Sequence, residues 1–124
     1  MKIMTTHEIA TQYQEMMNQR RFAEIQETFY DEQVVSQEPE KAAAMGFAVV
    51  TNGLESVKAK GVARRATIET VHSYVCSEPL VAGDFFSVVL KQEITFKGKP
   101  RMAIEEVGVF QVNNDKIVKE QFFY

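Results

Sequence analysis

Alternation of apolar and polar residues over the last quarter of the chain predicts two β-strands joined by a tight turn. The first strand gathers its largest apolar residues on one face, which comprises Met102, Ile104, Glu106, Gly108, Phe110 and Val112, because successive side chains of a strand point to opposite sides. The polar run Asn113-Asn114-Asp115 predicts the turn. One face of the returning strand comprises Val118, Glu120, Phe122 and Tyr124. The opposite faces are apolar too, so we expect both sides of the pair to be covered.

Two carboxylates interrupt this apolar pattern. Glu106 and Glu120 share strand faces with large apolar residues, and an isolated buried carboxylate is costly. If both face inward, each needs a partner or a proton, and we expect His72 or Arg101 as partners. A slip of one position at Glu105-Glu106 would instead turn one acid outward. We expect a pocket beside these acids.

Three helices are predicted in the first half of the chain. Thr5 and Glu8 have the spacing of a capping box, and the inner stripe of the helix that follows comprises Ile9, Tyr13, Met16 and Met17. A second short helix is predicted to end near Asp31, and its inner face comprises Phe22, Ile25 and Phe29. Asn52 with Glu55 predicts the capped start of a third helix, and its inner stripe comprises Leu54, Val57 and Val62.

The remaining segments are predicted to be strands and turns. Residues 34–36 favour a strand that Pro39 ends, and residues 40–50 are interpreted as a covering loop or short helix. From Thr67 the period changes to two, which predicts a strand over 67–81, a hairpin turn at 82–84 and a long strand over 85–96. Helices followed by a four-stranded antiparallel meander indicate an α+β fold. We expect a cone, in which the curved antiparallel sheet wraps around about three helices and leaves an internal pocket.

Length and composition indicate one globular domain and exclude several classes of partner. A chain of 124 residues can bury a real core. A net charge of −3 argues against nucleic acid, and the small cluster of Lys58, Lys60 and Arg64-Arg65 is typical of a solvated helix face. No apolar run is long enough to cross a membrane. A single cysteine, Cys76, and a start unlike a signal peptide favour a reducing, cytoplasmic location.

Several segments resemble a known family. The helix carrying Tyr13, the stretch from Phe29 to Glu38-Pro39, and the ending over residues 115–124 are similar to a SnoaL-like domain of the nuclear transport factor 2-like superfamily. This superfamily includes ketosteroid isomerases and polyketide cyclases. The resemblance spans nearly the whole chain, so it implies a single domain over residues 1–124. It also implies an apolar pocket for a small carbonyl-containing ligand and chemistry without a cofactor.

The resemblance assigns roles to individual residues. Ketosteroid isomerases use a tyrosine on the first helix as an oxyanion donor, and Tyr13 matches it. They use an aspartate before a proline as general base, and Glu38 matches it with one extra methylene. Their second donor, a protonated aspartate, falls on Gly108 here. This departure weakens enolate stabilisation, although Glu106 lies on the same strand face two residues away.

Each candidate has a simpler structural alternative. Glu38 is either the base of a proton transfer or a carboxylate at a cavity rim, and Tyr13 is either a ligand donor or a core tyrosine. The residues expected to bind ligand are His72, Glu106, Glu120, Phe86, Val88, Phe110, Phe122 and Tyr124. Two histidines and one cysteine do not form a metal cluster, so no metal is expected.

These alternatives leave three functional classes open. The first is a cofactor-independent isomerase or lyase with Glu38 as base and Tyr13 as donor. The second is a non-catalytic ligand-binding domain, which Gly108 favours. The third is an assembly module whose cavity is filled by its own side chains. For all three we expect a homodimer through the outer face of the sheet, where the apolar set comprises Val107, Val109, Ile117 and Phe123.

Overall fold

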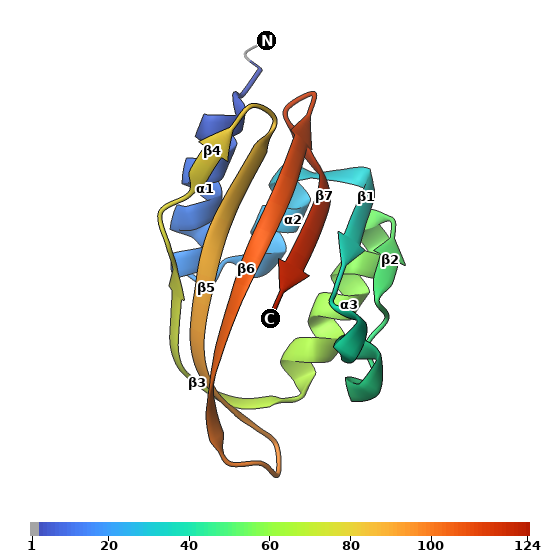
Figure 1. The fold of residues 1–124 in the computed structure, drawn as a ribbon, viewed down its shortest axis with the longest axis vertical. Helices are drawn as coiled ribbons and strands as arrows, with labels where there is room; N and C mark the ends of the chain where they lie inside the picture. The colour runs from blue at the N-terminus through green and yellow to red at the C-terminus, as the bar shows by residue number, and fades with distance from the viewer. Residues whose placement is uncertain (1–2) are drawn as a thin grey trace.

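The computed structural model describes residues 3–124 (Figure 1). Its helices are α1 (Thr6–Asn18), α2 (Phe22–Phe29), the 3-10 helix η1 (Glu40–Met45) and α3 (Leu54–Ala66). Its strands are β1 (Tyr30–Gln37), β2 (Val50–Asn52), β3 (Ile68–Cys76), β4 (Leu80–Ala82), β5 (Phe85–Phe96), β6 (Arg101–Asn113) and β7 (Lys116–Phe123). None of the helices described is both long and apolar enough to cross a membrane.

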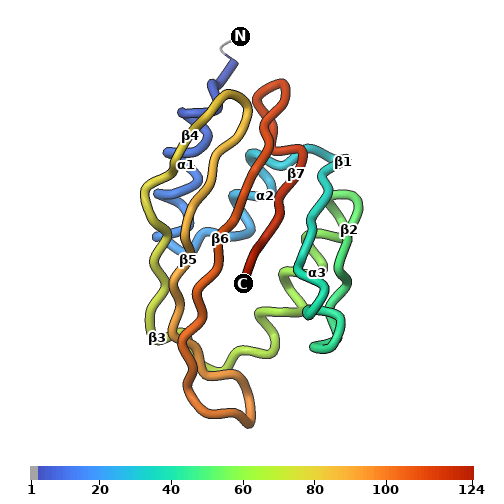
Figure 2. The backbone as a smooth tube through the Cα atoms, viewed as in Figure 1, coloured from blue at the N-terminus to red at the C-terminus, as the bar shows by residue number. Residues whose placement is uncertain are grey.

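The strands form one curved, open sheet in the order β2-β1-β7-β6-β5-β3, and β4 pairs with β5 beside β3. Strands β3, β5, β6 and β7 form the predicted antiparallel meander. Figure 2 shows α1 and α2 behind the strands on the β4–β6 side and α3 behind β1 and β2. The α+β class with a curved sheet around three helices is therefore confirmed.

One pairing was not predicted. Strand β1 runs parallel to β7, with Ser36 opposite Glu120. This contact joins segments 84 residues apart, and alternation within either strand carries no information about it. The same pairing is what brings the polar end of β1 to the buried acid of β7.

The helix caps and inner stripes agree with the prediction except at two residues, Asn52 and Val62. Thr5 caps α1 in the predicted box with Glu8. Asn52 does not cap α3; it lies in β2, and Gly53, with a φ of 88°, makes the turn into the helix. Val62 is not on the inner stripe either, because it is 60% exposed. It lies five residues after the buried Val57, which places it on the opposite side of the helix.

The inner faces of β5 and β6 are as predicted. Phe86, Val88 and Phe110 are buried in the core, and Glu106 faces inward with them. In β7 the register shifts, since Ile117 is opposite Val112 but Lys119 is opposite Gln111. The extra residue forms a bulge that turns both Ile117 and Glu120 inward. Ile117 is fully buried, so the expectation that it belongs to the outer face was wrong.

Candidate functional site

A cluster of aromatic rings holds Tyr13 in the interior of the cone. The Tyr13 ring lies 4.6 Å from that of Phe110 and 5.6 Å from that of Phe86, and these two phenylalanines stack at 4.7 Å. Phe122 meets Phe110 edge-on at 6.0 Å. Such pairs gain from ring geometry as well as from burial. The cluster therefore sets the direction of the Tyr13 hydroxyl.

The Tyr13 hydroxyl has no protein partner, although Tyr13 is only 2% exposed. It makes no hydrogen bond to the described residues. Every described side-chain nitrogen or oxygen that is closed off from water does have a partner. The hydroxyl therefore keeps a small accessible surface. The same reasoning applies to Oε2 of Glu106, because only Oε1 of that carboxyl is hydrogen-bonded.

Glu106 lies on β6 and is suited to donate a hydrogen bond. Gln92 donates to its Oε1 over 3.3 Å. Burial raises the pKa of Glu106, Arg64 opposes the shift, and the carboxylates of Glu38 and Glu120 add to it. A raised carboxyl pKa favours the protonated form, which carries an O–H donor. Burial raises the pKa of Tyr13, and the charges of Tyr74, Glu120, Cys76 and Glu106 add to this shift in that order.

The partners expected for the buried acids were wrong. His72 is exposed and its Nε2 lies 2.7 Å from the Thr95 hydroxyl. Arg101 is also exposed and forms an ion pair with Glu93 at 2.8 Å. Thr95 alternates with the inward Ile94, so His72 lies on the outer side of the sheet. Neither cation reaches the interior.

Glu120 is instead satisfied by groups on β1 and α3. The Tyr30 hydroxyl donates to its Oε1, and the Ser36 hydroxyl donates to its Oε2 over 2.6 Å. Lys60 then donates to Ser36 over 2.6 Å and to Glu38 over 3.2 Å. Burial raises the pKa of Glu120, while Ser36, Tyr30 and Lys60 oppose that shift. A chain of hydrogen bonds thus links the buried acid to Glu38.

Glu38 follows the end of β1, at the edge of this interior. Its amide donates to the Val49 carbonyl over 2.7 Å, which fixes the backbone just before Pro39. Its side chain is 13% exposed and is paired with Lys60. Burial and the neighbouring Glu38 raise the pKa of Tyr124 to about 12. The Glu38 charge adds to the raised pKa of Glu120, and the Glu120 charge adds to the raised pKa of Tyr13.

The space beside Gly108 is closed. A Cβ at this position would lie 3.0 Å from the Phe110 ring and 3.2 Å from the Phe122 ring. No carboxylate fits there unless both rings move. The second donor of the interior is therefore Glu106 and not residue 108.

Sequence reasoning placed Leu54 and Val57 on the inner stripe of α3, as the structure has them, but missed Lys60 on the same side. Lys58 is a solvated cation, paired with Glu27 and Glu55, as that interpretation expects. Lys60 is not a solvated cation, because its side chain is only 18% exposed. Its spacing of three from the apolar Val57 was the available signal. Ser36 and Tyr30 had no such signal, because their role depends on the β1–β7 pairing.

The other residues predicted to bind ligand are buried or half-buried. Phe86, Val88, Phe110 and Glu120 are buried, and Phe122 and Tyr124 are half-buried. Cys76 is buried, and burial raises the pKa of its thiol to about 12. Among residues 3–124 no group of three His, Cys, Asp or Glu side chains could hold a metal ion.

Tyr13 and Tyr30 form a matched pair for testing these assignments. Both are buried, but only the Tyr30 hydroxyl has a protein partner. Tyr30→Phe is expected to cost about 1–3 kcal/mol because Glu120 loses a donor. Tyr13→Phe is expected to stay within about 0.5 kcal/mol of the wild type. Urea unfolding measures both, and an equal loss for the two variants would contradict an open Tyr13 hydroxyl.

Comparisons with known proteins agree with this architecture. The profile of the SnoaL-like domain family matches residues 4–124. A structure from Mesorhizobium loti, provisionally assigned as a SnoaL-like polyketide cyclase [carbohydrate phosphatase], is 31% identical, with a TM-score of 0.89 over 98% of this chain and 100% of that one.

More distant structures share the fold. An NTF2-like protein of unknown function from Burkholderia pseudomallei is 15% identical, with a TM-score of 0.81 over 98% of this chain and 92% of that one. A provisionally assigned SnoaL-like polyketide cyclase from Jannaschia is 13% identical, with a TM-score of 0.76 over 99% of this chain and 88% of that one. A search among curated proteins finds no match. From the profile match over almost its full length, the chain belongs to the SnoaL-like domain family.

Proposed function

We propose that this protein is a cofactor-independent isomerase or cyclase that moves a proton on a small, mainly apolar carbonyl compound bound inside the cone. The observation that carries the proposal is the buried Tyr13 hydroxyl, which has no partner among residues 3–124 and whose pKa is raised by burial and, among other charges, by Glu106. A ligand oxygen between these two groups would satisfy both. The surrounding rings of Phe110, Phe86 and Phe122 supply apolar contact.

In the proposed reaction Glu38 acts as the base. Its carboxylate takes a proton from the carbon next to the carbonyl, and the electrons of that C–H bond form the enolate. Tyr13 and protonated Glu106 donate hydrogen bonds to the enolate oxygen, where the negative charge develops. Where the substrate carries a C=C bond next to the α-carbon, the enolate is a dienolate, and Glu38 returns the proton to its far carbon, so no oxidant or reductant is consumed. Lys60 holds the carboxylate at the pocket edge meanwhile.

Deuterium exchange tests the proposal directly. We expect the protein to speed exchange of the α-protons of 2-tetralone, a small bicyclic ketone, in D₂O, as followed by NMR. Glu38→Gln should lower this rate about 10²–10⁴-fold, the usual contribution of a general base, while the ketone still binds. Glu40→Gln, which alters an exposed acid two residues away, is the matched control. Equal rates for Glu38→Gln and the wild type would refute the role of Glu38.

A non-catalytic ligand-binding protein is the second candidate. Two observations favour it: the position of the second donor is closed at Gly108, and Glu38 is already engaged by Lys60. This function predicts that the ketone binds without enhanced exchange. Glu38→Gln would then change the affinity at most.

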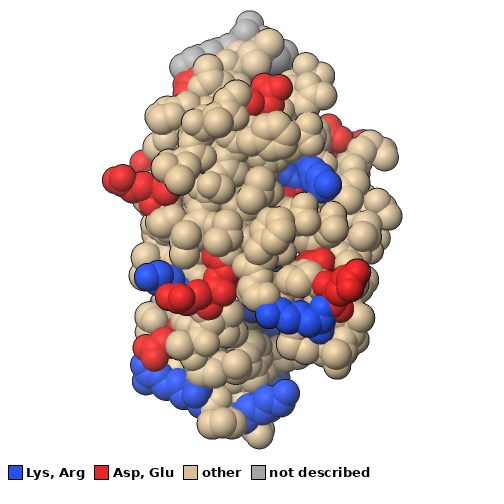
Figure 3. Space-filling view, in the orientation of Figure 1, with Lys and Arg blue, Asp and Glu red and all other residues tan. Residues whose placement is uncertain are grey.

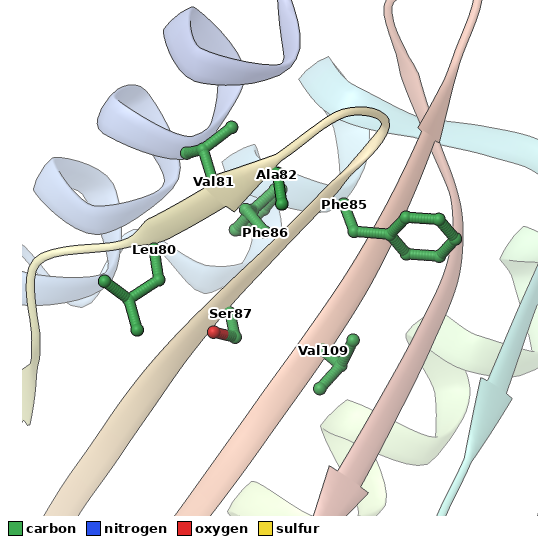
Figure 4. Close-up of a pocket in the computed structure, with 7 residues that line it drawn as sticks. All are labelled: Leu80, Val81, Ala82, Phe85, Phe86, Ser87 and Val109. Atoms are coloured by element: carbon green, nitrogen blue, oxygen red, sulfur yellow. The ribbon is translucent and has the colours of Figure 1, made fainter.

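We also propose a homodimer through the outer face of the sheet. Exposed apolar side chains gather there: Val75, Leu80, Phe85, Val89, Val107 and Phe123. Figure 3 shows few charged groups over the upper halves of β5 and β6. A hollow of about 280 Å³ lies between β4, β5 and β6, and Figure 4 shows the residues that line it. Light scattering should give twice the monomer mass, and Val107→Lys, at the centre of the face, should give the monomer.

The cytoplasm is the proposed location. Cys76 is a free, buried thiol, which fits a reducing compartment. Fractionation of the producing cell tests this.

A further inference from the structure

The cation Arg64 has no partner in the interior that the proposed function uses. It lies on α3 one turn after Lys60, on the side of the helix that carries the buried Val57. Lys60 is occupied by Ser36 and Glu38. The half-buried Arg64 guanidinium makes no ion pair or hydrogen bond to the residues described.

Arg64 faces groups from three strands of the sheet. Burial raises the pKa of Tyr74 on β3, of Glu106 on β6 and of Tyr124 after β7, and Arg64 opposes the shift in all three cases. The Arg64 charge thus acts on groups of three strands, which agrees with its half-buried position on the same side of α3 as Val57 and Lys60. Figure 1 shows α3 running past the end of β7 towards the start of β3, consistent with this position.

The hydrogen-bonding groups that remain free in this interior are mainly donors. The hydroxyls of Tyr13 and Tyr74 and the Arg64 guanidinium have no acceptor among residues 3–124. Glu106, whose protonated form is favoured by burial, adds a fourth donor. The Glu38 carboxylate at the edge is paired with Lys60. A ligand that satisfies this set must be rich in acceptors.

We propose that Arg64 binds a carboxylate of the ligand, so that this pocket prefers a keto acid to a neutral ketone. The guanidinium of arginine presents paired N–H groups that match the two oxygens of a carboxylate. The ketone oxygen then lies with Tyr13 and Glu106, and the carboxylate with Arg64 and Tyr74. This inference rests on the proposed function, since it names the substrate class of the same pocket.

A pair of probes that differ only in charge tests the role of Arg64. The probes are 3-benzoylpropionate and its methyl ester, titrated against the ¹⁵N-labelled protein at low and high salt. We expect the acid to bind about tenfold more tightly than the ester, the effect of one charged hydrogen-bonded pair. High salt should weaken only the acid.

Variants on α3 provide the controls. Arg64→Gln should abolish the preference for the acid and leave the affinity for the ester within about twofold of the wild type. Arg64→Lys should restore part of the preference, because it keeps the charge but loses the paired donors. Arg65→Gln, which alters the exposed neighbour that lies over the Phe22 ring, should retain the full preference.

The outcomes separate this inference from the proposed function. If the ester binds as tightly as the acid, or if Arg64→Gln weakens both equally, the carboxylate role of Arg64 is overturned while the pocket stands. If neither probe binds and 2-tetralone neither binds nor exchanges, the pocket itself is refuted, and the inference falls with it.

Discussion

Phe110→Ala is expected to lower the free energy of unfolding by about 3–5 kcal/mol, the usual cost of removing a buried phenylalanine ring. Phe110 is fully buried and contacts the rings of Tyr13, Phe86 and Phe122. Its removal leaves a cavity that three rings held by separate elements cannot fill together. Urea unfolding monitored by circular dichroism measures the loss.

The control for Phe110 is another phenylalanine of the same hairpin. Phe85 is 48% exposed on the outer face, so Phe85→Ala should cost less than about 1 kcal/mol when measured at concentrations where both variants have the same oligomeric state. A loss below about 1.5 kcal/mol for Phe110→Ala, well short of the expected range, would mean that the ring cluster does not organise the core. The orientation of Tyr13 would then need another explanation.

Glu120→Leu is expected to cost about 2–4 kcal/mol, because it leaves buried donors without an acceptor. The Tyr30 hydroxyl loses its only partner, and the Ser36 hydroxyl can no longer donate to the acid. Glu120→Gln keeps a carbonyl oxygen for one donor, so its cost should be about 1 kcal/mol. If both variants were as stable as the wild type, the network would have no structural role.

The buried acids also predict how stability depends on pH. Burial raises the pKa values of Glu106 and Glu120 above 4.5 in the folded protein. The unfolded state therefore releases these protons first as the pH rises, and folding loses free energy. The stabilisation from each group is complete below pH 4.5 and disappears as the pH passes the folded-state pKa.

A variant comparison isolates this contribution. Exposed acids with lowered pKa values, such as Glu24 and Glu93, make stability change with pH in the opposite direction. The wild type and the variant share these acids, so their effect cancels in the comparison. The difference in stability between the wild type and the double variant Glu106→Gln/Glu120→Gln should fall steadily as the pH rises from 4.5. Denaturant unfolding at several pH values measures it, and a constant difference would contradict burial of the ionisable forms.

Much of the site lies where local patterns placed it. Alternation along β6 put Glu106 and Phe110 on one inner face, and helical spacing put Tyr13 towards the core. These predictions hold because a regular strand or helix fixes the side of each residue relative to its neighbours. The same rule failed for Ile117, because the bulge in β7 adds one residue that alternation cannot anticipate.

The sequence by itself determined the α+β class, the antiparallel meander and the inward direction of Tyr13, since each follows from periodicity within single elements, and it favoured an inward Glu106. Only the tertiary structure decided which groups satisfy the buried acids. Glu120 meets Ser36 through a parallel pairing of distant strands, and Lys60 reaches Ser36 because α3 packs against β1. Such contacts depend on the relative placement of several elements, which no local pattern encodes.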